Sequence, residues 1–386
     1  MDSSLRRIAS HYLLTPQGFQ PRPLITIRVE GDHHEIVAVE QYNAGLDSMP
    51  GVEFYAGILC AGFVNAHSHI ELSYLRGAIA GGGGYAAFAA GIAKVRDTFS
   101  EEERLRAIEE ADRAMWQEGV DAVGDIVNGA TSFTTKATSP IHYKNFAEVF
   151  GLRVCNLEQQ RELLKYPNTS LTPHSIYSVK DAPFKEVCNI DINTLLSIHF
   201  MESPDEALLY AGEGSLHEWY KAVGFECDFL HYGSPAERIV ACVPKDRNLM
   251  LVHNCFVTER DIEVVTNHFT APVSWALCPR SNAYISGIEP RSVELLRAHN
   301  NINICIGTDS LSSNWSLSMI EELKMFRDIP LAELLQWATI NGAKALGIED
   351  KYGSIEVGKR SGIVNLTGVD LTEFKLTEQT KAVRVL

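Results

Sequence analysis

Short apolar runs alternate along the chain with longer amphipathic stretches, a pattern typical of β-α units around a parallel sheet. The expected strands end near Asn65, Asn128, Phe150, His174, His199, His253, Cys278 and Asp309. Between them, residues 101–119, 258–269 and 292–300 have apolar positions at the spacing of an amphipathic helix. Eight such units predict an α/β fold, a (β/α)8 barrel of the TIM type, with an active site at the carboxyl ends of its strands.

The two ends of the chain follow a different pattern. Residues 1–56 and 353–386 contain apolar and polar residues in alternation, without intervening helices, as in PLITIRVEG and KAVRVL. We therefore expect a small β-sandwich domain built from both termini, around a barrel domain of residues 57–352. A chain of 386 residues with 45% hydrophobic content is long enough to form a barrel and a small domain.

The charge of the chain favours one class of partner. A net charge of -15 and a pI near 5.3 argue against binding to nucleic acid or to an anionic membrane surface, so a small-molecule substrate is expected. The eight cysteines are scattered singly and are expected to be reduced core residues. Because no segment has the apolar length of a secretory signal or a membrane span, we expect a cytoplasmic protein. A homodimer is one assembly open to it.

The segment GFVNAHSHIELS places His67 and His69 at the end of an apolar strand. Such a pair often has only a structural role, since the ring nitrogens of buried histidines commonly form hydrogen bonds with the backbone or with water. In a strand, however, residues i and i+2 point to the same face, so both imidazoles can address one ion. A catalytic zinc site needs further ligands from distant parts of the chain. The polar residues at the other strand ends, His174, His199 and Asp309 among them, are candidates.

Six segments in order carry a family resemblance: GFVNAHSH, LTPHSIYSV, SIHFMES, LVHNCFVTERD, CPRSN and IGTDS. As an ordered set they resemble the amidohydrolase superfamily and most closely its aminohydrolase branch. That branch includes guanine, cytosine, S-adenosylhomocysteine and aminofutalosine deaminases, together with triazine hydrolases. The resemblance extends from the N-terminal strands to GSIEVGKRSGIV, and it implies the barrel and small β domain that the pattern also predicts.

The resemblance implies a metal site. His67 and His69 match the ligands of the first strand, His199 that of the fifth and Asp309 that of the eighth, a set of three nitrogens and one oxygen. Zinc is favoured over Fe(II). Relatives with two ions have a carboxylated lysine or a glutamate at the end of the fourth strand, where this chain has Pro173-His174. One divalent ion per chain is therefore expected.

The resemblance also implies roles in catalysis and substrate binding. Glu202 matches the carboxylate that transfers protons to the substrate ring, and His253 matches the histidine beside the attacking water; Asp309 is both a ligand and a proton acceptor. The alternatives are a solvated loop carboxylate for Glu202 and a helix N-cap for Asp309. The expected substrate contacts are His174, Arg280 and Asn282, although Arg280 could equally form a structural salt bridge.

These residue types suit a hydrolytic deamination. A divalent ion lowers the pKa of its bound water from about 15.7 towards ~7, which supplies the attacking hydroxide at neutral pH. Glu202 would protonate a ring nitrogen, and ammonia would leave. The expected function is a metal-dependent aminohydrolase acting on an amino-substituted heterocycle, such as a nucleobase or a nucleoside-like compound related to aminofutalosine. The alternatives are a cyclic amidase or chlorohydrolase at the same site, which Glu202 and His253 disfavour, and a non-catalytic scaffold, which the four ligand positions disfavour.

Overall fold

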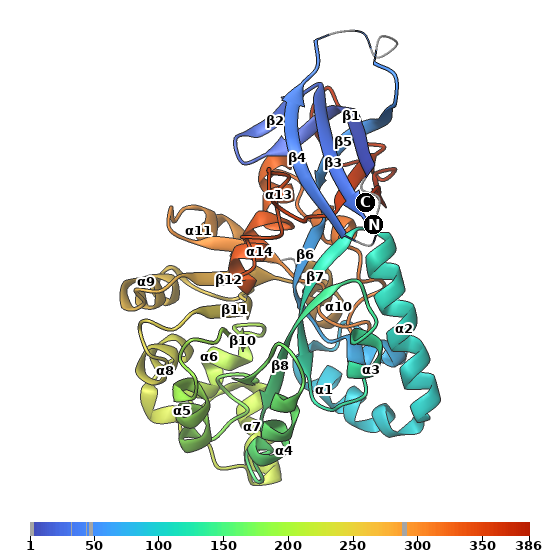
Figure 1. The fold of residues 1–386 in the computed structure, drawn as a ribbon. Coiled ribbons are helices and arrows are strands. Elements are labelled where there is room, and N and C mark those ends of the chain that lie inside the picture. The colour runs from blue at the N-terminus through green and yellow to red at the C-terminus, as the bar shows by residue number, and fades with distance from the viewer. Residues whose placement is uncertain (1–3, 32, 44, 46–48, 288–291) are drawn as a thin grey trace.

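Eight parallel strands surrounded by helices form the larger part of the molecule (Figure 1). The computed structural model describes residues 4–31, 33–43, 45, 49–287 and 292–386. The strands are β6 (Phe63–Ser68), β7 (Val120–Val127), β8 (His142–Val149), β9 (Thr169–Pro173), β10 (Leu196–Phe200), β11 (Leu249–His253), β12 (Val273–Leu277) and β13 (Asn303–Ile306). Each strand ends within about three residues of the position predicted from the sequence, so the eight predicted strands are confirmed.

The strands pair as two parallel four-stranded sheets, β6-β7-β8-β9 and β10-β11-β12-β13. Single bridges join these halves on both sides, between Ser175 and His199 and between Ser68 and Asp309. At the first seam the His199 amide donates to the His174 carbonyl at 2.9 Å, and at the second the Thr308 amide donates to the His67 carbonyl at 3.0 Å. The two sheets are therefore joined into the ring that the sequence predicts.

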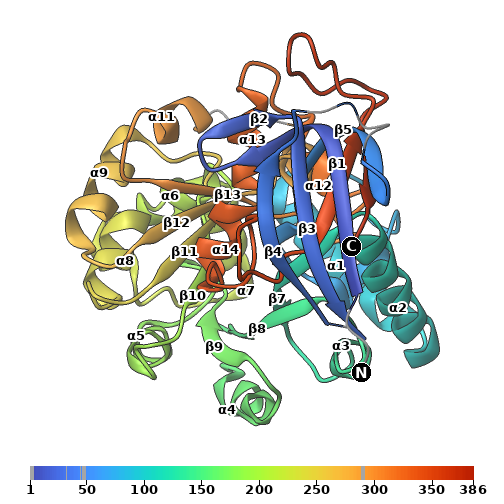
Figure 2. The ribbon, with the colours of Figure 1, turned by 45° about the horizontal axis from the view of Figure 1, so that its top comes forward.

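Helices cover the outside of the ring (Figure 2). They are α1 (Gly84–Val95), α2 (Glu101–Gln117), α3 (Phe133–Lys136), α4 (Leu157–Arg161), α5 (Asp181–Asn189), α6 (Asp205–Tyr210), α7 (Gly214–Val223), α8 (Pro235–Cys242), α9 (Glu259–His268), α10 (Pro279–Ser286), α11 (Val293–Arg297), α12 (Met319–Leu323), α13 (Leu331–Trp337) and α14 (Ile340–Leu346). The three predicted helices correspond to α2, α9 and α11. Reciprocal capping boxes, Ser100 with Glu103 and Thr258 with Asp261, fix where α2 and α9 begin. Among the described residues, no helix has the length and apolar character needed to cross a bilayer.

The termini form a second sheet, drawn at the top of Figure 1. Its strands are β1 (Ser4–Thr15), β2 (Gly18–Pro21), β3 (Pro23–Glu30), β4 (His33–Gln41), β5 (Val52–Ala61), β14 (Ile363–Thr367) and β15 (Lys381–Arg384). The order is β15-β14-β5-β1-β3-β4, with β2 also on β1. These strands form the small β domain that was predicted from both termini. The strands form one sheet, because β5 pairs with β1 along one edge and with β14 along the other.

The junction between the two parts lies at Gly62. The sequence predicts one strand through residues 57–67, whereas β5 ends at Ala61 and β6 begins at Phe63. A Cβ at Gly62 would lie 2.1 Å from the carboxylate of Asp121. That buried carboxylate accepts from Arg384 Nη2 at 2.9 Å and from the Gly362 amide at 2.6 Å, so it connects β7 to the C-terminal strand. Only a residue without a side chain fits between the two sheets here.

Gly62→Ala should therefore destabilise the fold. The added methyl must displace the Asp121 carboxylate from its ion pair, and we expect the free energy of unfolding to fall by ~1–3 kcal/mol, the usual cost of overpacking. Urea unfolding followed by circular dichroism measures this. Gly129→Ala is the matched control, since a Cβ at Gly129 meets no atom within 4 Å. Equal stability of the two variants would show that the junction tolerates a side chain.

Candidate active site

Polar side chains gather where four barrel strands end. β6 positions His67 and His69, β10 positions His199 and Glu202, β11 ends at His253, and β13 leads into Asp309. All six side chains are buried, although they are polar or charged. Because parallel strands of a barrel end on the same face, residues up to about 240 positions apart in the chain meet here. The structure thus brings together every predicted metal ligand and both predicted proton-transfer residues.

Four atoms surround one small space. His69 Nε2 lies 3.2 Å from His67 Nε2, 3.3 Å from His199 Nε2 and 3.5 Å from Asp309 Oδ1, and His67 Nε2 lies 3.9 Å from that same oxygen. Ligand atoms at the usual ~2.0–2.1 Å from a tetrahedral zinc ion lie about 3.3 Å from one another. A proton on His69 Nε2 could serve only one of the neighbouring nitrogens, and the other contact would bring two lone pairs together. The four residues therefore fit a divalent cation.

The other ring nitrogen of His199 orients its imidazole. His199 Nδ1 donates to the His174 carbonyl at 2.9 Å, which leaves its Nε2 as a lone pair facing the shared space. Burial lowers the pKa of His67 and of His199 well below the usual range, so both rings are neutral. Neutral imidazole is the form that binds a metal ion.

Two serine hydroxyls hold the Asp309 carboxylate. Ser281 and Ser313 donate to its Oδ2 at 2.6 and 2.8 Å, while Oδ1 faces the histidines. Burial raises the pKa of this carboxyl, but its electrostatic interactions with the imidazoles of His69, His253 and His67 and the hydrogen bond from the Ser281 hydroxyl lower that pKa to about 2. Asp309 is therefore ionised at neutral pH and can act as a ligand. Its backbone adopts φ +56°, an uncommon conformation for a residue other than glycine.

Glu202 lies on the opposite side of His253 from the amide of Asn282. The distance from Glu202 Oε1 to His253 Nε2 is 3.9 Å. Burial, and after it the charge of Asp309, raise the pKa of Glu202 to about 8, so this carboxyl is protonated at neutral pH. Two neighbouring carboxyls thus hold opposite protonation states, which is the arrangement expected of an acid and a base in one site.

A buried carboxylate that the sequence analysis did not select holds Glu202 in place. Glu206, in the first turn of α6, accepts from the backbone amides of Met201 and Glu202 at 2.7 Å each and from that of Ser203 at 3.2 Å. These bonds fix the turn after β10, in which Met201 has φ +51°. The sequence signal for Glu206 is its position four residues after Glu202, in the segment that follows the strand histidine His199.

The three predicted substrate contacts occupy different places. The His174 ring stacks on His199 with centroids 4.6 Å apart. Asn282 Oδ1 accepts from His253 Nδ1 at 2.8 Å, so its amide borders the site. Arg280 is turned towards the loop after β13: its guanidinium donates to Ser316 Oγ at 2.7 Å. No salt bridge of Arg280 is found among the described residues. The binding roles of all three stay predictions.

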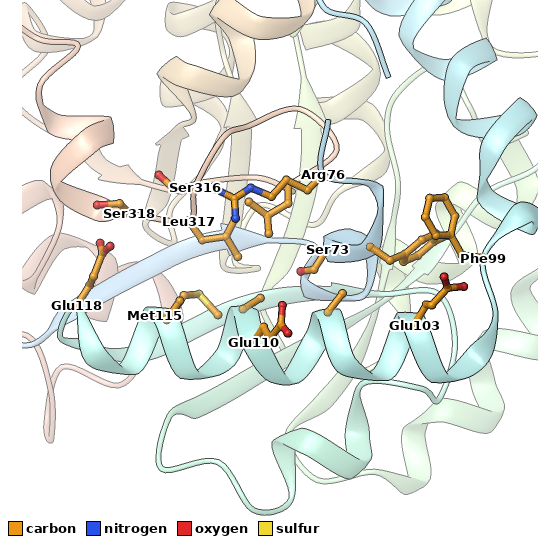
Figure 3. Close-up of a pocket in the computed structure, with 15 residues that line it drawn as sticks. Ser73, Arg76, Phe99, Glu103, Glu110, Met115, Glu118, Ser316, Leu317 and Ser318 are labelled. Carbon is orange, nitrogen blue, oxygen red and sulfur yellow. The ribbon is translucent and has the colours of Figure 1, made fainter. Parts of the chain in front are cut away.

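A cavity of about 470 Å³ lies beside these residues but does not contain them (Figure 3). It is bounded by α2, by the turn of 3-10 helix after His69 and by the loop after Asp309. Figure 3 shows Glu103, Glu110 and Glu118 along α2 on one side of the cavity, with Arg76 across it. None of the six clustered residues lines it. The cavity therefore shares two loops with the site without being the place of the chemistry.

The comparisons with known proteins agree with this arrangement. The model of the amidohydrolase family matches residues 58–385. The chain belongs to the amidohydrolase family. An adenosine deaminase of Helicobacter pylori is 28% identical over 337 residues, which cover 80% of this chain and 79% of that protein. A 5-methylthioadenosine/S-adenosylhomocysteine deaminase of Thermoanaerobacter pseudethanolicus is 26% identical over 387 residues, 90% of this chain and 81% of that protein.

Solved structures extend the likeness to the whole fold. The crystal structure of Helicobacter pylori aminofutalosine deaminase in complex with methylthio-coformycin superposes with a TM-score of 0.81 at 24% identity. The superposition covers 99% of the present chain and 100% of the Helicobacter pylori chain. This amidohydrolase-family chain therefore has the barrel and the terminal β sheet of that enzyme in the same arrangement, and the resemblance deduced from the motifs is confirmed.

The raised pKa of Glu202 makes a prediction about stability. In the metal-free protein the folded state keeps this proton up to a pH of about 8, whereas the unfolded chain releases it near pH ~4.3. The stabilisation is therefore complete below the unfolded value and is lost as the pH rises through about 8. Glu202→Gln does not titrate, so relative to wild type it should gain up to ~1.4 kcal/mol per pH unit within that window.

Urea unfolding of the metal-free wild type, Glu202→Gln and the control Glu213→Gln at several pH values between about 5 and 9 tests this. Glu213 is an exposed residue at the start of α7, and its variant should follow wild type at every pH. Parallel curves for wild type and Glu202→Gln would contradict the assigned protonation state.

Proposed function

We propose that this amidohydrolase binds one divalent metal ion per chain and deaminates an amino-substituted heterocycle. Zinc is favoured over Fe(II), because imidazole nitrogen and carboxylate oxygen are common zinc ligands and these four residues would hold one ion while water completes its coordination. The observation that carries the proposal is geometric: His69 Nε2 lies within 3.5 Å of His67, His199 and Asp309, and the buried carboxyl of Glu202 lies 3.9 Å from His253 Nε2. The substrate class follows the named activities of the relatives: a nucleobase or a nucleoside-like compound, with an aminofutalosine-like compound as one candidate.

His67, His69, His199 and Asp309 would hold the ion. When bound, the ion would activate a water molecule for attack on the ring carbon that carries the amine. Asp309 Oδ1, which faces the cluster, takes a proton from that water. Glu202 donates its proton to the neighbouring ring nitrogen and makes the carbon more electrophilic. His253, with Nδ1–H bonded to Asn282, presents its Nε2 lone pair to the attacking water.

The bonds balance as a hydrolysis. One carbon–oxygen bond forms from water and one carbon–nitrogen bond breaks. The proton held by Asp309 passes to the leaving amine, which departs as ammonia, and the ring keeps a carbonyl group in its place. The proton from Glu202 stays on the ring nitrogen of the product, and the hydroxyl proton released as the carbonyl forms returns to Glu202. No oxidant or further substrate is needed.

One alternative reaction keeps the same residues. An S-triazine hydrolase of Gordonia rubripertincta is 32% identical over 182 residues, 44% of this chain. A cyclic amidase or a chlorohydrolase would need the same activated water but a different leaving group. A buried acid such as Glu202 favours an amine as leaving group, because the ring nitrogen must be protonated before the amine can be displaced. Ammonia release from aminopurines, aminopyrimidines and adenine nucleosides, with chloride release from a chlorotriazine in parallel, distinguishes these activities.

The metal prediction concerns stoichiometry. We expect about one equivalent of zinc per chain after zinc-supplemented expression, since the four residues surround one space. His199→Ala removes one of the three imidazoles and should lose both the ion and activity. Elemental analysis of both proteins measures this. Two tightly held ions in wild type, or an ion retained by His199→Ala, would refute the assigned ligand set.

The mechanistic prediction contrasts the two carboxyls. Glu202→Gln keeps the shape of the side chain but cannot exchange the proton, so turnover should fall ~10²-fold or more while zinc is retained. Asp309→Asn removes a charged ligand as well as a proton acceptor, so it should weaken zinc binding and lower turnover together. Zinc content and ammonia release are measured side by side, with Glu213→Gln as the control. Loss of zinc from Glu202→Gln would make Glu202 a ligand, and full activity would exclude it as the acid.

A further inference from the structure

Two proton-transfer residues of the site are held from one turn. Ser281 Oγ donates to Asp309 Oδ2 at 2.6 Å, and the next residue, Asn282, accepts from His253 Nδ1 at 2.8 Å through its side-chain oxygen. Both belong to the first turn of α10 and are buried. Asp309 and His253 lie at the ends of different strands, so this turn is a physical link between them.

The turn itself is anchored to the barrel. Cys278 follows β12 directly and caps α10, and its carbonyl accepts from the Asn282 amide at 3.0 Å. Pro279 fills the first helical position, where no amide proton is needed. The Arg280 amide donates to the buried carboxylate of Glu322 at 3.0 Å. Ser281 and Asn282 therefore cannot move independently of the strand.

The side-chain bonds of this pair are directed at the site. Ser281 Oγ contacts the Asp309 carboxylate and the hydroxyl of Ser313, which bonds the same carboxylate. Asn282 bonds His253, while its Nδ2 is buried without a partner in the described part of the chain. An unpaired buried donor lowers the stability of the fold. A role in folding alone therefore does not account for an asparagine at this position.

We propose that Ser281 and Asn282 are positioning residues of the deaminase, an inference that rests on the proposed function. Ser281 turns the Asp309 carboxylate so that Oδ1 faces His69, 3.5 Å away. Asn282 holds the His253 ring so that Nε2 faces Glu202. Ser281 acts through Asp309, a proposed metal ligand, whereas Asn282 acts through His253, which is not a proposed ligand. Replacing Ser281 should therefore change zinc binding, and replacing Asn282 should change turnover.

The experiment compares Ser281→Ala, Ser281→Thr, Asn282→Ala and Ser286→Ala with wild type. Zinc dissociation constants come from competition with a chelator, and kcat and KM come from ammonia release. Ser286 lies at the end of the same helix, has no side-chain bond among those described and is the matched control. The thermal midpoint of each zinc-loaded protein reports on folding.

Ser281→Ala should weaken zinc binding ~10-fold, the lower end of the usual effect of losing a partner of a metal ligand, because Ser313 still bonds Asp309. Ser281→Thr keeps the hydroxyl and should restore binding to within about threefold of wild type. Asn282→Ala should keep zinc binding within about threefold but lower kcat ~10-fold, and a rise in KM would measure the separately predicted substrate contact of Asn282. Ser286→Ala should match wild type in every measurement.

Three results would overturn the inference. An unchanged zinc affinity in Ser281→Ala would show that Ser281 does not position Asp309. If Ser281→Ala and Ser281→Thr weakened zinc binding equally, the effect would come from folding. If Asn282→Ala weakened zinc binding as much as Ser281→Ala does, His253 would be a metal ligand. A wild type without ammonia release would refute the proposed function, yet the zinc measurements would still decide the role of Ser281.

For Asn282 an activity-independent measurement is the nitrogen NMR spectrum of histidine-labelled, zinc-loaded protein. The His253 ring, assigned by its absence in His253→Gln, should carry its proton on Nδ1 in wild type and lose this preference in Asn282→Ala. An unchanged tautomer in that variant would exclude the positioning of His253.

Discussion

Closure of the ring of strands is the constraint on which the site depends. The two seams are closed by backbone bonds of the ligand residues and their immediate neighbours: the His67 carbonyl accepts from Thr308 and Asp309, and the His199 amide donates to His174. Each seam brings the ends of two strands to the distance of one hydrogen bond. The side chains of the proposed metal ligands are then only a side-chain length apart. The fold and the candidate site are consequently produced by the same contacts, and a shift in strand register would disrupt both.

The buried polar cluster is held by bonds to groups outside it. Without them, charged and polar side chains at this depth would destabilise the fold strongly. Glu206 accepts from three amides under Glu202, and two serines bond Asp309. Positive φ values at Met201, His253 and Asp309 place further strain at the strand ends. Such strain persists only where the surrounding structure fixes it, and it is concentrated here at the functional residues.

Much of this could be predicted from the sequence, because apolar runs that end in histidine or aspartate mark both the strands and the face that carries the chemistry. The break at Gly62 could not be, since an apolar run does not show which of two sheets its halves join. The role of Ser281 depends on a contact with Asp309, 28 positions away in the chain. The direction of the Arg280 side chain depends on Ser316, in a loop whose path only the fold determines. Local pattern thus predicted the residues that cluster at the strand ends, and long-range packing determined what supports them.

The two carboxyls show how one buried site can hold one carboxyl ionised and its neighbour protonated. Both are buried, and burial alone would raise both pKa values. Asp309 faces imidazoles and accepts two hydroxyl protons, so its charged form is favoured. Among the described residues no side chain donates a hydrogen bond to the Glu202 carboxyl, and the charge of Asp309 further disfavours a second negative charge nearby. Ionisation of the first carboxyl therefore helps to keep the second protonated, and the difference follows from the serine hydroxyls that bond Asp309 but not Glu202.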